Sequence, residues 1–182
     1  MPRASRLSAA LAAAVAASLA GPASAQLDGK PPDQFMKAPD SLLDGSAHER
    51  RSQISGYGVF IPSYGIGAAG RYALPIFKDG FIPELNESLE VEFGGDFIFP
   101  TFGTGPALVV IAAEPRWTFH FTPQVDGYFK LGVAGLISLG PSLFSPIQPV
   151  AGIGLAYKVA GNLWLRAEAS YPVMSLGAGL DF

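Results

Sequence analysis

The chain has 182 residues, no cysteine and a formal net charge of −3. The missing cysteine excludes disulfides and cysteine-based metal sites or catalysis, and the acidic balance argues against a nucleic-acid partner. The mean hydropathy is +0.30, although 22 glycines and 16 prolines disfavour long helices. Beyond the N-terminus, no apolar run approaches the roughly 18–20 residues that a membrane helix needs. This composition predicts an all-β chain.

The first 25 residues have the pattern of a secretory signal peptide. Two bases, Arg3 and Arg6, precede a run of alanine, leucine and valine that closes on the small residues Ala-Ser-Ala. We expect cleavage after Ala25, so that Gln26 begins a mature chain of net charge about −5 once the two arginines are removed. The alternative is a retained membrane anchor, which the short apolar run disfavours. Without cysteine, a lipoprotein anchor is excluded.

Residues 26–53 differ from the rest of the chain in having scattered charges, a Pro-Pro pair and no sustained period. We interpret them as a flexible polar leader in the periplasm. A short helix over 39–51, capped by Asp40, is the alternative. The charged run from His48 to Arg51 is interpreted as a solvated cluster rather than a site.

From residue 54 onward, apolar residues alternate with small or polar ones, which is the period of a β-strand with one apolar face. The predicted strands span 54–61, 64–74, 89–99, 107–121, 126–137, 149–158, 163–171 and 174–182. Such lengths suit a tilted crossing of a bilayer, which takes about 9–11 residues. If the prolines at 62 and 172 were kinks instead of turns, six longer strands would remain. Pro115 predicts a bulge or kink within its strand.

The last strand alternates without interruption and ends on an aromatic residue that nothing in the sequence follows. Its apolar face is Met174, Leu176, Ala178, Leu180 and Phe182. This strand resembles the terminal strand of bacterial outer-membrane β-barrels, which the barrel-assembly machinery recognises. The resemblance implies that machinery as a partner and these five residues as the assembly signal.

The two faces of the predicted strands differ in side-chain size as well as polarity. One carries Phe, Leu, Ile and Trp, and the other carries Gly, Ala and ionisable residues. Because the interior of an eight-stranded barrel is narrow, we expect the small and charged face inside and the bulky face toward lipid. A soluble barrel would show the reverse. The predicted lumen charge network is Arg71, Glu90, Glu92, Asp96, Glu114, Arg116, Lys130, Arg166, Glu168 and Asp181.

These features together resemble the small outer-membrane β-barrels of the OmpA/OmpX type, over residues 54–182. The resemblance implies an eight-stranded antiparallel transmembrane barrel in the bacterial outer membrane, in contact with membrane lipid and lipopolysaccharide. Barrels of this kind include anchors, adhesins and enzymes, so the fold alone leaves the function open.

No catalytic, cofactor-binding or metal residues are predicted. The segment Thr118-Phe119-His120 is similar to the neighbourhood of the catalytic histidine in barrel lipid A deacylases, but strand spacing places no Ser or Glu beside His120. Glu90 and Glu92 share a face and would meet bases in a lumen. We therefore predict a non-enzymatic barrel that is structural or presents loops. The alternative is a small pore or carrier for small or hydrophobic compounds, and an enzyme acting on lipid A is less favoured.

Overall fold

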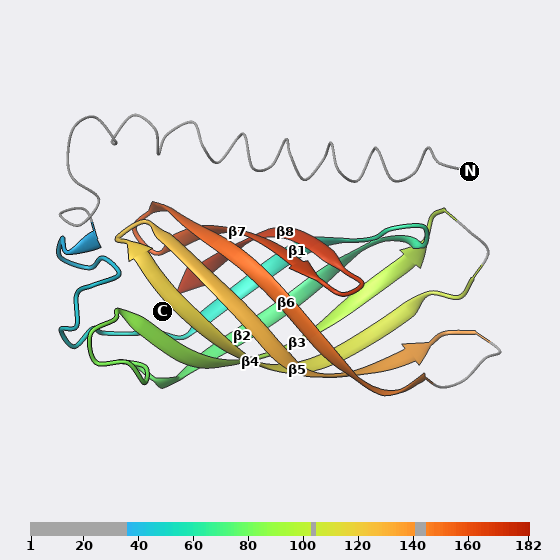
Figure 1. Ribbon diagram of the computed structural model, residues 1–182. Coiled ribbons are helices and arrows are strands. Elements are labelled where there is room, and N and C mark those ends of the chain that lie inside the picture. The colour runs from blue at the N-terminus through green and yellow to red at the C-terminus, as the bar shows by residue number, and fades with distance from the viewer. Residues whose placement is uncertain (1–35, 103–104, 141–144) are drawn as a thin grey trace, which may run out of the picture. The chain divides into compact units, whose positions relative to one another are not determined.

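The computed structural model describes residues 36–102, 105–140 and 145–182. Within these ranges, eight antiparallel strands follow one another around a closed barrel, and the last pairs with the first (Figure 1). The strands are β1 (Gln53–Ile61), β2 (Gly65–Phe77), β3 (Glu87–Pro100), β4 (Leu108–Thr122), β5 (Val125–Ser138), β6 (Ser145–Ala160), β7 (Leu163–Ser170) and β8 (Met174–Asp181). The predicted eight-stranded barrel is confirmed. The predicted signal peptide lies outside the described residues.

No helix in the described ranges is both long enough and apolar enough to cross a membrane. In the segment before β1, residues 39–51 form turns and bends, so the alternative of a helix there is wrong. Asp40 has a φ of 60°, which no right-handed helix accommodates.

One proline, Pro115, does not produce the bulge that was predicted for its strand. Pro115 pairs with Val91 in an unbroken β3–β4 register, so the predicted bulge is absent there. Proline removes one N–H donor, and the β4–β5 pairing has no partners at residues 114 and 115, although its register continues from Ala113 to Arg116 without a shift. The register shifts lie instead near strand ends, for example between His120 and Thr122 and between Lys158 and Ala160. The segments at residues 62–64 and 171–173 are turns, so eight strands form and not six.

The strand boundaries differ most from expectation in two places. β6 begins at Ser145, four residues before the predicted start, and the connection between β2 and β3 shrinks to residues 78–86. Glu87 makes this connection compact. Its carboxylate is fully buried and accepts hydrogen bonds of 2.6 Å from the backbone N–H groups of Phe81 and Ile82.

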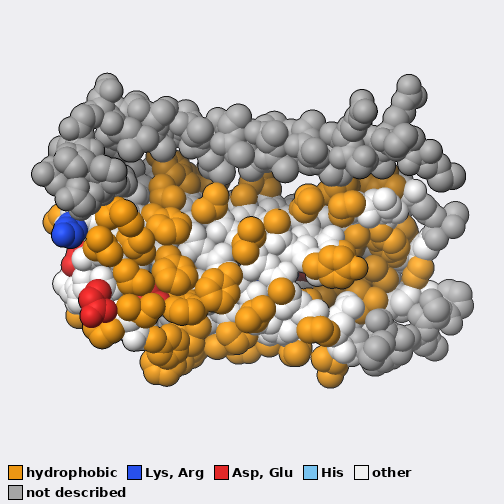
Figure 2. Space-filling view, in the orientation of Figure 1, with side chains coloured by type: hydrophobic (Ala, Val, Ile, Leu, Met, Phe, Trp, Pro, Cys, Tyr) orange, Lys and Arg blue, Asp and Glu red, His pale blue; other side chains and the backbone are white. Residues whose placement is uncertain are grey.

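The alternation of side chains places the apolar residues outside. Phe93 is 48% exposed, whereas its neighbour Glu92 is 1% exposed, and Phe119 packs on the outer wall against Trp117 and Phe129. Figure 2 shows hydrophobic side chains spread over the outer wall. The exposed large apolar residues of the strands include Ile54, Ile66, Tyr72, Leu74, Phe93, Phe97, Ile111, Leu131, Val133, Ile153, Leu155, Leu165, Leu176 and Leu180. A wall of this character requires lipid rather than water around it.

The two ends of the barrel are chemically different. We call the end with connections 78–86, 123–124 and 161–162 the terminal end, because β1 begins and β8 ends there. The far end has connections 62–64, 101–107, 139–144 and 171–173, and these contain no Asp, Glu, Lys or Arg. The charged side chains visible in Figure 2 gather toward the terminal end.

The interior near the far end is apolar. We call the cluster of Tyr57, Val59, Ala69 and Ile98 the apolar plug. Ile98 has no exposed surface and Val59 only 3%. Partly buried side chains pack around the plug, namely Ile61, Tyr64, Leu108, Val110 and Val173. These side chains, from β1–β4 and the connections 62–64 and 171–173, therefore occupy the lumen at this level with apolar groups.

We predict that Leu131→Arg, in the middle of β5 and 58% exposed, destabilises the barrel by about 2–4 kcal/mol, because it places a charge opposite acyl chains. The measurement is urea unfolding of protein refolded into phospholipid vesicles. Phe81→Arg is the matched control, because Phe81 is equally exposed (58%) but lies in the connection 78–86. A neutral or stabilising Leu131→Arg would indicate that water surrounds this wall.

Candidate functional site

The lumen near the terminal end contains a network of charged side chains centred on Glu92. Its carboxylate lies 2.8 Å from Arg116 Nη1, 3.0 Å from Lys130 Nζ and 3.0 Å from Arg166 Nη2. The four residues come from β3, β4, β5 and β7, so the network joins opposite walls of the barrel. All four side chains are almost completely buried, and burial of charge at this density requires close pairing.

Glu168 on β7 is the second centre of the network. It lies 2.8 Å from Lys130 Nζ and 3.1 Å from Arg166 Nη2. The phenol groups of Tyr57 and Tyr128 donate to it at 2.8 and 2.7 Å. Tyr57 also belongs to the apolar plug, so this one side chain joins the charged and apolar parts of the lumen. The predicted lumen charge network contained neither tyrosine, because it was drawn from charged side chains alone and left out the hydroxyl groups that reach the carboxylate.

A glycine makes room for this arrangement. Gly154 on β6 pairs with Tyr128 on one side and with Glu168 on the other. A Cβ atom at position 154 would lie 2.3 Å from the Tyr128 ring, so only glycine lets the tyrosine cross β6 and reach the carboxylate.

The remaining predicted lumen charges lie around these two centres. Arg116 Nε donates to Glu90 at 2.9 Å, and Lys130 Nζ lies 3.1 Å from Glu114. Arg71 pairs with Asp96 one level nearer the far end. We call these nine residues the lumen network: Arg71, Glu90, Glu92, Asp96, Glu114, Arg116, Lys130, Arg166 and Glu168.

The tenth predicted residue, Asp181, lies at the terminal edge of the lumen and has uncharged partners. Its carboxylate accepts hydrogen bonds from Gln53 Nε2 at 2.8 Å and from Trp164 Nε1 at 2.6 Å. Gln53 in turn accepts from Arg166 at 2.8 Å, so Asp181 is connected to the network through an amide.

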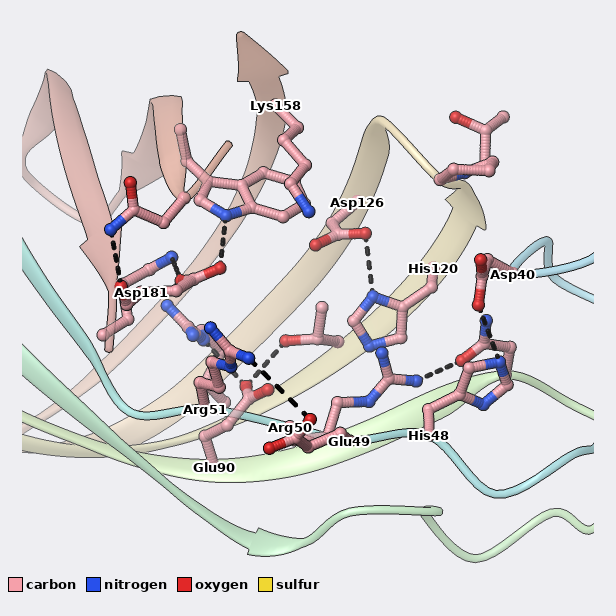
Figure 3. Close-up of a pocket in the computed structure, with 18 of the residues that line it drawn as sticks. Asp40, His48, Glu49, Arg50, Arg51, Glu90, His120, Asp126, Lys158 and Asp181 are labelled. Atoms are coloured by element: carbon pink, nitrogen blue, oxygen red, sulfur yellow. Dashed lines mark hydrogen bonds and ion pairs between the residues drawn. The ribbon is translucent and has the colours of Figure 1, made fainter. Parts of the chain in front are cut away.

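A polar cavity of about 530 Å³ opens at the terminal end (Figure 3). Its floor includes Glu90 and Arg116, and the segment 36–52 forms part of its rim. Arg50 holds that segment against the barrel by donating to Lys78 O at 3.3 Å and to the Asn86 amide. Burial lowers the pKa of the Arg50 guanidinium, and the nearby Asp126 carboxylate opposes this.

His120 on β4 lies inside this cavity with partners on both ring nitrogens. Its Nε2 is 3.1 Å from Ser88 Oγ and its Nδ1 is 2.8 Å from Asp126 Oδ1. The expectation that no serine lies beside His120 is therefore wrong. The reason is that Ser88 belongs to β3, where it pairs with Thr118, and period-two reasoning along a single strand cannot place it.

The order Ser88–His120–Asp126 recurs in serine hydrolases, but the protons are arranged differently here. The Ser88 hydroxyl has one proton and donates it to Glu90 Oε1 at 2.7 Å. The serine is also fully buried. A nucleophilic serine must give its proton to the histidine and meet the substrate, whereas here Glu90 is an acceptor within reach of that proton and the serine is buried. The three side chains extend the lumen network to the rim of the cavity.

No protein-family model and no curated protein sequence matches the chain. Among solved structures, a de novo designed transmembrane β-barrel has a TM-score of 0.54 at 16% identity, over 75% of this chain and 100% of the design. The N-terminal β-barrel domain of OprF from Pseudomonas aeruginosa has a TM-score of 0.51 at 16% identity, over 74% of this chain and 98% of that domain.

Ail, an outer membrane protein of Yersinia pestis studied in phospholipid nanodiscs, has a TM-score of 0.50 at 16% identity, over 74% of this chain and 100% of its own. At such identities the likeness concerns the fold. The architecture is that of the small outer-membrane barrels, as the strand pattern predicted.

We predict that Glu92→Gln destabilises the barrel by about 3–5 kcal/mol, because three buried cations lose their shared carboxylate. Urea unfolding in vesicles measures the loss. Glu84→Gln is the control, since Glu84 is exposed in the connection 78–86 and its substitution should cost less than about 0.5 kcal/mol. Equal unfolding midpoints for the two variants would contradict a stabilising role for the network.

Proposed function

We propose that the chain is a non-enzymatic β-barrel of the bacterial outer membrane, and that it serves as a closed structural element of the bilayer. The observation that carries this proposal is that two separate groups of side chains occupy the lumen, one at each of two levels along the barrel axis. The lumen network crosses the interior in the terminal half, and the apolar plug fills it nearer the far end. An ion entering from the terminal cavity meets paired charges first and hydrocarbon next.

The short, uncharged far end favours this structural role over the presentation of loops. Two of its connections, 62–64 and 171–173, have three residues each. In the described part of its rim, exposed apolar side chains include Phe102 and Tyr171. Connections of three residues extend little beyond the barrel, so they present little surface to a protein or a polysaccharide.

We place the terminal end, with the leader 26–53, in the periplasm after cleavage of the signal peptide 1–25. The charges at this end and the cavity rim formed by 36–52 suit an aqueous compartment. At the opposite surface, the far connections contain no Lys or Arg that could pair with phosphate groups. Contact with lipopolysaccharide therefore runs through its acyl chains against the outer wall.

A small pore or carrier is the second candidate, and the terminal cavity favours it. The volume of the cavity, about 530 Å³, is large enough for a small solute. Its floor, however, is the ion pair between Glu90 and Arg116, whose nitrogen and oxygen lie 2.9 Å apart. Passage would require this pair, the Glu92 centre and the apolar plug to open together.

We predict that the purified barrel produces no steady single-channel openings in planar lipid bilayers. Ile98→Gly, which removes the most buried side chain of the apolar plug, should also be silent because the lumen network still fills the terminal half. Persistent openings of the wild-type protein would contradict the closed structural role and favour the pore. Openings in Ile98→Gly alone would show that the network is permeable to ions.

We also propose that the barrel-assembly machinery recognises β8 together with the terminal residue that follows it, through Met174, Leu176, Ala178, Leu180 and Phe182. Leu176 and Phe182 are each 64% exposed on the outer wall, and β8 closes the barrel against β1. We predict that Phe182→Ser lowers the amount of folded barrel in the outer membrane several-fold in cells. The readout is the band that shifts on heating, in gels of fractionated membranes.

Phe99→Ser is the control for this experiment, because Phe99 is a comparably exposed outward phenylalanine (54%) outside the last strand. If both variants assemble to the same extent, the terminal aromatic is not a specific signal. Refolding of both proteins into vesicles in vitro separates an assembly defect from a loss of intrinsic stability.

A further inference from the structure

Three side chains with metal-ligating atoms converge in the segment before β1. They are Asp40, Asp44 and His48, each four residues from the next. The segment is not helical, so this convergence is not a consequence of helical spacing. One ligand atom from each lies within 4.8 Å of the others. Sequence spacing predicted no such set.

Two of the three distances between the ligand atoms, those from His48, match a tetrahedral metal site. His48 Nε2 lies 3.3 Å from Asp40 Oδ1 and 3.4 Å from Asp44 Oδ2. Zinc binds imidazole nitrogen and carboxylate oxygen at about 2.0–2.1 Å, so the ligands of a tetrahedral zinc site lie roughly 3.3–3.4 Å apart. The three side chains would need little movement to hold the ion.

His48 supplies an independent indication of a missing cation. Its side chain is only 10% exposed, and its Nε2 has no hydrogen-bond partner in the described part of the chain. Figure 3 shows this nitrogen facing the Asp40 carboxylate. A buried nitrogen lone pair facing two carboxylates is unfavourable. A metal ion bound between these groups gives this nitrogen a partner.

Backbone hydrogen bonds also hold two of the proposed ligands, Asp44 and His48, in place. Asp44 accepts the backbone N–H groups of Asp40 at 2.8 Å and Ser46 at 3.1 Å. The backbone N–H of His48 donates to Asp79 in the connection 78–86 at 3.1 Å. Outer hydrogen bonds of this kind orient the ligands of metal sites.

We propose that Asp40, Asp44 and His48 bind one divalent transition-metal ion of the zinc class. One imidazole and two carboxylates suit such an ion, whereas Ca²⁺ takes six to eight oxygen ligands. Asp40 is 65% exposed, which leaves an entry path and a fourth position for water. The bound ion fixes the segment 36–52 at the rim of the terminal cavity, which both Asp40 and His48 line.

The test is a titration of the refolded full-length mature barrel with Zn²⁺, after chelator treatment, by isothermal calorimetry in detergent. We expect one Zn²⁺ per chain and no binding of Ca²⁺. His48→Ala and Asp44→Asn should each weaken Zn²⁺ binding by at least about tenfold. Co²⁺ in place of Zn²⁺ should give the visible absorption bands of a tetrahedral site in wild type and lose them in His48→Ala.

His120→Gln is the matched control, because His120 is the only other histidine of the chain. This substitution should leave Zn²⁺ affinity unchanged. Heat-dependent migration on gels verifies that each variant is folded, since positions 44 and 48 lie outside the strands. If Zn²⁺ binds His48→Ala as tightly as wild type, or does not bind wild type, the proposal is wrong. In the second case the two carboxylates contact His48 without a metal ion between them.

Discussion

The narrow interior of a closed eight-stranded barrel is the constraint on which the rest of this structure depends. Alternation along each strand sends every second side chain into that interior, and the space there admits few large groups. Charged side chains are tolerable only where their partners are within contact distance. Glu92 satisfies this by facing Arg116, Lys130 and Arg166 from three other strands. Small residues such as Gly154 provide the remaining room.

The lumen divides into two regions that follow different physical rules. In the terminal half, ion pairs and phenol hydroxyl groups saturate buried carboxylates. Nearer the far end, Val59 and Ile98 pack as they would in the core of a soluble domain, although the outer wall beside them is also apolar. Tyr57 connects the two regions, since its ring packs in the plug while its hydroxyl reaches Glu168. A barrel filled in this way is stabilised from within at both levels.

The polar groups that surround a solvent-accessible cavity lie at the terminal end. Both histidines of the chain line the cavity there, and each faces carboxylates: His120 faces Asp126, and His48 faces Asp40 and Asp44. The segment 36–52 contributes three of these five groups and is joined to the barrel by backbone and side-chain hydrogen bonds. The far end offers no comparable set, because its connections contain no charged residue.

The sequence by itself determined the barrel and the orientation of its faces. Period-two alternation is a property of each strand separately, so the outward position of Phe93 and the inward position of Glu92 follow from the local order of residues. Only the tertiary structure decided which side chains meet. Ser88 lies beside His120, Tyr128 crosses Gly154 to reach Glu168, and His48 meets two carboxylates, because of cross-strand register and the path of the chain before β1. Strand register sets the first two contacts and the turns of the segment 36–52 set the third, and neither can be read from the order of residues along one strand.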